Sequence, residues 1–230
     1  MPIASGTPSR NCPLCPRLKQ FRDDWREREP DWFNAPVPSF GPASASLLIV
    51  GLAPGLRGAN RTGRPFTGDF AGDLLYETLK RFGFAGGDYG ARPDDGLVLV
   101  NARITNAVRC VPPENKPTTE EIRTCRQFLE STIREMPNLQ AIVTLGHISH
   151  VSTIAALKHR RSSAPFRHGA SHDLGSVRVF ASYHCSRYNT STGVLTSDMF
   201  SGVFAMVRSY LDARNQAITC SAFLSGGKTG

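Results

Sequence analysis

Four short runs of apolar residues divide the chain into a repeating pattern. They cover residues 47–50, 97–104, 141–145 and 177–182. Each run is nearly continuous in apolar residues and does not alternate strictly with polar ones. This pattern is typical of strands that are covered on both faces, as in a parallel sheet. We therefore expect four buried parallel strands.

Segments with helical periodicity follow these runs. We expect helices over residues 73–82, 119–134, 149–158 and 199–213. The second has the clearest start, because Thr118 or Thr119 can cap it after Pro117 and two glutamates lie in its first turn. The alternation of strands and helices predicts an α/β fold, namely a three-layer α/β/α domain with a central four-stranded parallel sheet.

The two ends of the chain differ from this pattern. Prolines recur through the first 45 residues, where only residues 17–28 could form a short helix. The segment from Asn215 onward is rich in serine and glycine. We therefore expect a single domain over residues 1–214 and a loose tail over residues 215–230.

Three of the four loops at one edge of the predicted sheet have an unusual composition. Residues 51–69 contain five glycines, three arginines and the carboxylate of Asp69. Residues 105–116 and 183–193 add amide, imidazole, hydroxyl and guanidinium groups. Ligands of open parallel sheets bind beyond the carboxyl ends of the strands, glycines let a backbone approach them closely, and arginines suit phosphates. Three such loops together favour a functional site over ordinary polar connections.

Composition and charge limit the classes of function. The 230-residue chain has 27 Lys and Arg against 19 Asp and Glu, a formal net charge of +8. This excess suits a polyanionic partner without specifying one. No apolar run approaches about 18 residues, so we expect no membrane span. The first residues lack the apolar stretch of an export signal, so we expect a cytoplasmic protein.

The six cysteines of this chain point to thiolate or metal chemistry more than to disulfides. Cys12 and Cys15 form a Cys-x-x-Cys pair, and Cys110 and Cys125 follow near a strand end and inside a predicted helix. Four thiolates suit either a [4Fe–4S] cluster or a structural zinc ion. The spacing alone leaves both open.

Five stretches of the sequence resemble the family 5 (B-type) uracil-DNA glycosylases of prokaryotes. They are residues 51–55 (GLAPG), 63–69 (GRPFTGD), 109–117 (RCVPPENKP), 165–170 (PFRHGA) and 182–189 (SYHCSRYN). The resemblance runs in the family's order from Cys12 to about Arg214. It implies a uracil-DNA glycosylase fold and a DNA repair enzyme that flips uracil out of the helix, and hydrolyses its N-glycosidic bond to leave an abasic site.

The resemblance also implies several properties of the whole protein. We expect a monofunctional, monomeric enzyme, associated with the nucleoid of a prokaryote, that acts on double- or single-stranded DNA containing uracil. Other deaminated bases such as hypoxanthine would be substrates too. A [4Fe–4S] cluster would join the N-terminal segment, about residues 10–45, to the domain. Its ligands would be Cys12, Cys15, Cys110 and Cys125.

Individual roles follow from the family pattern. Asp69 and Asn115 would hold or polarise the attacking water and stabilise the cationic sugar, with Asp69 the favoured group. His184 would stabilise the charge that develops on the leaving base. Phe66 would stack on the base, and Asn189 would support the pocket. The backbone of four residues would line it: Leu52, Ala53, Pro54 and Gly55.

Three features leave alternatives open. Asn106 lies where type-4 enzymes read uracil with an amide, but it can also be a structural amide that holds its loop. Leu52 and Ala53 are apolar where related families have an acidic or amide residue, so the group that activates water is not fixed. Cys185 stands where many relatives have proline.

The expected DNA contacts are arginines in the same loops. They are Arg57, Arg61, Arg64 and Arg187. A protein that uses these loops and an iron–sulfur or zinc staple only to bind damaged DNA, without excising a base, is the alternative function.

Overall fold

A five-stranded sheet forms the centre of the computed structural model, which describes residues 6–225 and, over 218–225, the backbone alone. Its strand order is β4-β1-β5-β7-β6. The strands are β1 (Leu47–Gly51), β4 (Ala102–Asn106), β5 (Ala141–Leu145), β6 (Ser171–Leu174) and β7 (Val177–Ser182). All neighbours pair in parallel except β6, which pairs antiparallel with β7. The predicted α/β fold with four parallel strands is confirmed, and β6 is an edge strand that was not predicted.

Helices cover both faces of the sheet. The longer helices are α1 (Pro16–Arg28), α3 (Phe70–Arg81), α4 (Thr119–Arg134), α5 (His147–Ala156) and α7 (Ser197–Ser225), and the short ones are α2 (Ala59–Thr62), α6 (Arg187–Ser191) and the 3₁₀ turns Pro113–Asn115 and Arg161–Ser163. Alternate residues of β1 divide the core into two: Leu47 and Ile49 pack with residues of α3 and α7, whereas Leu48 and Val50 pack with residues of α4 and α5. The three layers are therefore those predicted.

Helix α4 begins and ends at the predicted residues because its cap is complete. Thr118 Oγ1 accepts from the backbone N–H of Glu121 at 3.2 Å, and the Glu121 carboxylate accepts from the backbone N–H of Thr118 at 2.7 Å. The same carboxylate also accepts two hydrogen bonds from Arg17 of α1. This ion pair attaches the N-terminal helix to α4.

The predicted strand over residues 97–104 is two strands. Residues Val98–Leu99 (β3) pair with Ala85–Gly86 (β2) in a separate small hairpin, and only β4 enters the main sheet. Between them Asn101 has a left-handed backbone with φ of 51°, and its side chain accepts from the Ser46 N–H at 2.7 Å. This reversal interrupts a run that is continuous in the sequence.

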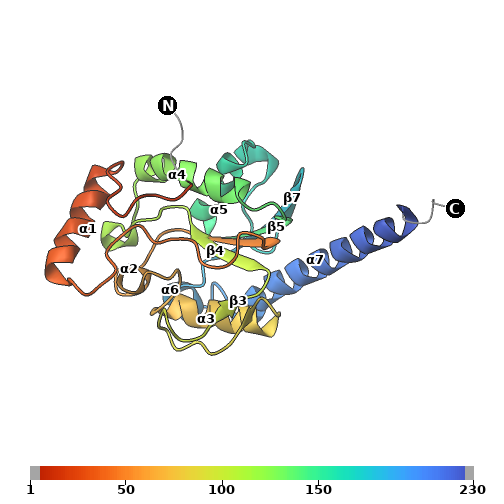
Figure 1. Cartoon of the computed structure of the whole chain (residues 1–230), viewed down its shortest axis with the longest axis horizontal. Helices are drawn as coiled ribbons and strands as arrows, with labels where there is room; N and C mark the ends of the chain where they lie inside the picture. The colour runs from red at the N-terminus through yellow and green to blue at the C-terminus, as the bar shows by residue number, and fades with distance from the viewer. Residues whose placement is uncertain (1–5, 226–230) are drawn as a thin grey trace.

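The C-terminal helix α7 is longer than the predicted segment 199–213. No glycine or proline interrupts residues 203–225, so the backbone continues as a helix through the first part of the predicted tail. The far end of α7 projects away from the rest of the fold (Figure 1). Residues 226–230 of the predicted tail lie outside the described residues. Within the described part, no helix is both long and apolar enough to cross a bilayer.

Candidate functional site

The ends of β1 and β4 bring together two side chains of the predicted site, Phe66 and Asn106. Gly51 pairs in register with Asn106. A Cβ on Gly51 would lie 2.6 Å from the ring of Phe66 and would overlap the amide oxygen of Asn106. Only glycine leaves room for both side chains here. The aromatic ring and the amide are therefore neighbours across a bare stretch of backbone.

The Asn106 amide is buried and incompletely hydrogen-bonded. Its side chain is 3% exposed, and Oδ1 has no hydrogen-bond partner among the described residues. Buried polar atoms are normally paired, and an unpaired one indicates a missing partner. The alternative in which Asn106 is a structural amide that holds its loop does not explain this free oxygen.

His184 also lies close to Phe66. The two rings are 6.1 Å apart between centroids, with 29° between their planes. The Asn189 side-chain N–H donates to the backbone carbonyl of His184 at 2.8 Å, which holds the loop that carries the imidazole. Burial lowers the pKa of His184. The ring is therefore neutral at neutral pH, and one of its nitrogens can donate a hydrogen bond.

Asp69 caps the helix that begins at the end of the glycine-rich loop. Its Oδ1 accepts from the Gly72 N–H at 3.1 Å at the start of α3. The other oxygen faces the backbone of Gly55 and Gly58, where added Cβ atoms would lie 3.1 and 2.7 Å from it. Burial raises the pKa of Asp69 although hydrogen bonds from the backbone of Gly72 and Ala71 oppose the shift, and no cation forms an ion pair with it within the described residues. Its ionised form is therefore costly to hold.

Asn115 does not join this group. It is exposed in the turn Pro113–Asn115, where Glu114 and Asn115 both have positive φ, and its backbone N–H donates to Pro112. The structure therefore separates the two candidates for water activation: Asp69 is half-buried beside the glycine-rich loop, and Asn115 is on the surface.

A cavity of about 430 Å³ opens beside His184. Its lining is made of Leu52, Leu145, Gly146, His147, Ile148, Ser149, Phe166, Tyr183, His184 and Asn189. This volume is typical of small-ligand sites. Of the four residues predicted to line the pocket through their backbone, only Leu52 does so: Pro54 is buried, Gly55 faces Asp69, and Ala53 packs against the cysteines described below.

The sequence does not predict several of the residues that line the cavity. His147 and Ile148 directly follow β5, at the fourth strand end on the same edge of the sheet. Their position in the sequence therefore indicated a place near the site, although the composition of this segment did not. Phe166 lies in the stretch 165–170 that carried part of the family resemblance, and no role was given to it. Its ring also contacts His147, at 5.5 Å between centroids.

Three of the four predicted DNA-contacting arginines are exposed, namely Arg57, Arg61 and Arg187. The guanidinium of Arg187 lies over Phe70 at 5.5 Å, and the next residue, Tyr188, is 74% exposed. The predicted DNA contact is wrong for Arg64. Its side chain is 5% exposed and forms a buried ion pair with Asp95, so it does not face a partner. Position in a basic loop did not distinguish these cases.

The four predicted ligand cysteines form one cluster. Cys12, Cys15, Cys110 and Cys125 line the same cavity at the contact between the N-terminal segment and α4. All four are free thiols. Burial raises the pKa of Cys15 to about 11 and that of Cys125 to about 12. Thiolates are therefore unstable here unless a positively charged group binds them.

Two buried arginines accompany the cysteines. Arg22 is 1% exposed and donates to Cys110 Sγ at 3.3 Å, and Arg109 is 2% exposed. Within the described residues neither forms an ion pair with a carboxylate, and the Nε atom of each has no hydrogen-bond partner. Burial lowers the pKa of Arg109 to about 10. Within the described residues, therefore, no direct ion pair balances these two buried cations.

The thiols are not arranged for a single ion. No three or more His, Cys, Asp or Glu side chains of the described residues converge on a point that could hold one metal ion. Tetrahedral zinc with Zn–S bonds of about 2.3 Å would bring its sulfurs to about 3.8 Å from one another. Within the described residues the four thiols therefore line one small cavity and do not form a site for a single ion.

Comparisons with known proteins show the family of the chain. Residues 38–208 match the family model of the uracil DNA glycosylase superfamily. The chain is 46% identical to a type-5 uracil-DNA glycosylase of Thermus thermophilus over 82% of this chain and 89% of the relative. It is 38% identical to a type-5 enzyme of Pyrobaculum aerophilum over 84% of this chain and 86% of the relative. A type-4 enzyme of the same archaeon is 36% identical over 61% of this chain and 58% of its own length.

Proposed function

This chain belongs to the uracil DNA glycosylase superfamily and within it to the type-5 enzymes, and from that premise we propose that it excises uracil and hypoxanthine from DNA. The observation that carries the proposal is the free amide oxygen of Asn106 beside the ring of Phe66. An extruded base would stack on the ring and take its hydrogen bonds from the amide.

The chemistry of the amide supports the choice of bases. An asparagine side chain offers one acceptor oxygen and one donor nitrogen side by side. Uracil presents N3–H beside the O4 acceptor, and hypoxanthine presents N1–H beside the O6 acceptor, so each can form the same pair of hydrogen bonds. Cytosine presents an unprotonated N3 beside an amino group. In the same position its N3 would face the amide oxygen, acceptor against acceptor, and its amino group would face the amide nitrogen, donor against donor. Unpaired buried polar groups exclude such a base strongly.

The reaction breaks the bond between C1′ of the sugar and the base nitrogen. The bonding electrons leave with the base, whose oxygen becomes negative, while C1′ becomes cationic; water then adds to C1′ and its proton goes to the base. The neutral imidazole of His184 donates to the developing negative oxygen. We assign the water and the sugar cation to the Asp69 carboxylate, because a fixed charge in a partly dry site stabilises the transition state strongly.

The cavity supports a monofunctional enzyme. A lyase that cuts the strand after base release uses an amine that attacks C1′. No lysine is among the residues that line the described cavity. The expected product is therefore an intact strand with an abasic site.

Base flipping requires DNA contacts around the cavity. Arg57, Arg61 and Arg187 are exposed and can neutralise phosphates. Among the described residues Tyr188 is the most exposed large apolar side chain, and it adjoins the pocket residue Asn189. An exposed aromatic ring there can fill the stack from which the base has left, as inserted apolar side chains do in other DNA-binding proteins.

The cysteine cluster fits a [4Fe–4S] group held by Cys12, Cys15, Cys110 and Cys125. Such a group bound by four thiolates carries net negative charge. It would supply the counter-charge that the buried Arg22 and Arg109 do not receive from a carboxylate. When bound, the group would supply cohesion between the N-terminal segment and α4, not electron transfer. Ala53 packs against the cysteines, and the Val108 N–H donates to the Leu52 carbonyl at 2.9 Å, so the same region supports the loop at the cavity.

The test uses purified protein and labelled duplexes with uracil opposite guanine or adenine, a uracil-containing single strand, and a hypoxanthine duplex. We expect base release, detected as strand cleavage after alkali, and no alkali-independent cleavage. Asp69→Asn is the matched inactive control. A gel shift without base release from any substrate would replace this proposal by the DNA-binding alternative. Gel filtration tests the expected monomer, and co-sedimentation with the nucleoid of the source cell tests the expected location.

A further inference from the structure

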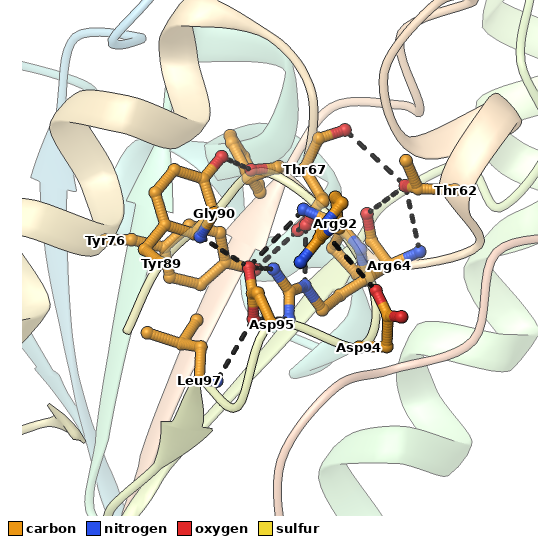
Figure 2. Close-up of polar contacts among 12 residues, drawn as sticks. Thr62, Arg64, Thr67, Tyr76, Tyr89, Gly90, Arg92, Asp94, Asp95 and Leu97 are labelled. Atoms are coloured by element: carbon orange, nitrogen blue, oxygen red, sulfur yellow. Dashed lines mark hydrogen bonds and ion pairs between the residues drawn. The ribbon is translucent and has the colours of Figure 1, made fainter. Parts of the chain in front are cut away.

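A buried ion pair connects the glycine-rich loop to a segment 31 residues away. Arg64 Nη1 and Nη2 donate to the two carboxylate oxygens of Asp95 at 2.8 and 2.6 Å, and Arg64 Nε donates to Thr67 Oγ1 at 2.7 Å (Figure 2). The side chains are 5% and 2% exposed. All three nitrogens of the guanidinium therefore donate to the protein itself, and two of the three bonds go to Asp95.

Aromatic rings enclose this pair. The guanidinium carbon lies 5.3 Å from the ring centroid of Phe40, 5.6 Å from that of Tyr76 and 5.8 Å from that of Tyr89. Two of these rings also hold the loop that Arg64 begins. The Tyr76 hydroxyl donates to the Pro65 carbonyl at 2.6 Å, and the Tyr89 hydroxyl donates to the Phe66 carbonyl at 3.3 Å. Arg64 and the carbonyls of the next two residues are therefore fixed by one cage.

The loop needs this support because Phe66 is strained. Its φ is 54°, a left-handed conformation that costs a bulky residue roughly 1–2 kcal/mol. The Phe66 carbonyl also presses on Gly72, where a Cβ would overlap it. Without external contacts, the backbone would relax to negative φ and turn the ring away from Gly51.

Asp95 is itself fixed from its own side. Its carboxylate accepts from the backbone N–H groups of Gly90 at 2.9 Å and Leu97 at 3.0 Å (Figure 2). These bonds close the segment between β2 and β3, residues 87–97. Arg64 holds the pKa of Asp95 well below its ordinary value, so the carboxylate is ionised throughout the physiological range. The segment thus presents a permanent, preoriented anion to Arg64.

We propose that Asp95 is a positioning residue for base excision: through Arg64 it holds the ring of Phe66 in the strained conformation that receives the flipped base. The proposal rests on the proposed function. Asp95 touches neither the cavity nor Asp69, so it acts through the loop alone. The segment 87–97 is then a brace for the site and not a surface connection.

The first test compares Asp95→Asn with Asp173→Asn. Asp173 forms the same two-bond pair with Arg178, but that pair is exposed at the far edge of the sheet. Asp95→Asn should slow single-turnover release of uracil by about 10- to 100-fold, as small misplacements of reacting groups do, with affinity for abasic product DNA within about twofold of wild type. Asp173→Asn should change neither. Equal rates for the two variants would overturn the proposal.

A double-mutant cycle separates positioning from general damage to the fold. In the Phe66→Ala background there is no ring to hold, so Asp95→Asn should cost less than about twofold. If the rate losses of the two single variants instead multiply in the double variant, Asp95 has a merely structural role. Arg64→Lys keeps the charge but cannot form the fork, so it should behave like Asp95→Asn and provides a second variant if that one folds poorly.

Hydrogen exchange gives a readout that needs no activity. Amides of residues 66–72 should exchange at least about tenfold faster in Asp95→Asn than in wild type or Asp173→Asn, because the loop loses the contact that holds it. A tenfold loss of protection corresponds to about 1.4 kcal/mol of local stability. Unchanged exchange there would overturn the brace whatever the kinetics show. If wild type releases no base while exchange responds as expected, the proposed function fails and the brace stands as a structural device.

Discussion

The protein buries arginine side chains at two places, and the two differ in what neutralises the charge. Arg64 is enclosed by aromatic rings and paired with Asp95 through two short hydrogen bonds. Arg22 and Arg109 are at least as deeply buried, yet within the described residues no carboxylate forms an ion pair with either. They lie beside the thiols of Cys110 and Cys125.

The difference indicates which region is complete as a polypeptide. Burying a charge is expensive unless a partner of opposite charge is held in good geometry, and removing one partner typically costs about 3–5 kcal/mol. The Arg64 site contains both partners. The cysteine site contains two cations and four thiols, and burial raises the pKa of Cys15, of Cys110 and of Cys125, the last to about 12. It gains its anions only when the thiols become ligands.

The largest effect should follow from removing one ligand. Cys110→Ser is expected to abolish the brown colour and the absorbance near about 400 nm, and to lower the free energy of unfolding by about 3–5 kcal/mol, because Arg22 and Arg109 lose their counter-charge. Urea unfolding and an iron assay measure both. Cys185→Ala is the control. Cys185 is fully buried in the main core, away from the cluster, so this variant protein should keep its iron. A colourless wild type with stoichiometric zinc would contradict the cluster.

A second prediction concerns a buried charge with no counter-ion, Asp69. Asp69→Asn should lower the single-turnover rate by about 10²- to 10³-fold, as the loss of one strong electrostatic contact to a transition state does. Asparagine caps a helix as well as aspartate does, so the start of α3 should survive. Single-turnover kinetics on a uracil duplex measure the effect; an unchanged rate would move the role to Asn115.

The same variant should be more stable than wild type at neutral pH. Burial raises the folded-state pKa of Asp69 above its unfolded value, so its contribution to stability is present at low pH and is lost as the pH rises through that folded pKa. Asparagine never ionises. The melting temperature of Asp69→Asn should therefore exceed that of wild type at pH 7, and the gap should shrink toward about pH 4. A pH-independent loss of stability would contradict this account.

A third, smaller effect tests the cations at the cysteine site. Arg109→Met fills similar space without charge, and should make chelator-driven loss of the cluster about tenfold faster, equivalent to about 1.4 kcal/mol. In the cluster-free protein the sign should reverse, because the arginine is then an uncompensated buried charge. The decay of absorbance and urea unfolding of the apoprotein measure the two. A loss of stability in both forms would indicate that Arg109 acts only by packing.

The sheet and its layers were predictable because burial on both faces leaves a mark in the sequence. Continuous apolar runs gave β5 and β7 their bounds, and the Thr118–Glu121 capping box gave α4 its start. Edge strand β6, with exposed Ser171 and Asp173, carries no such mark. The division of the run 97–104 depends on the backbone of Asn101, and a left-handed residue inside an apolar run is invisible to periodicity.

The site was predictable where a motif carries it and not where burial decides. Phe66, Asn106 and His184 come together as the ends of the strands require. Arg64 shares its loop with Arg57 and Arg61, so charge pattern treated them alike. Its partner Asp95 lies 31 residues away in a glycine-rich turn with no motif, and only the folded structure brings the two together.

The smallest predicted effect separates those arginines by the salt dependence of DNA binding. Each exposed arginine that neutralises one phosphate adds about 0.9 to the slope of log affinity against log salt concentration. Arg57→Ala, Arg61→Ala and Arg187→Ala should each reduce the slope by about that amount. Arg64→Lys should leave the slope unchanged even though it slows excision, because the Arg64 guanidinium of the wild type is paired with Asp95 and contacts no phosphate. Fluorescence anisotropy with an abasic duplex over a salt series measures the slopes. A reduced slope for Arg64→Lys would mean that the pair opens when DNA binds, and the contrast between the two buried sites would then hold only for the free protein.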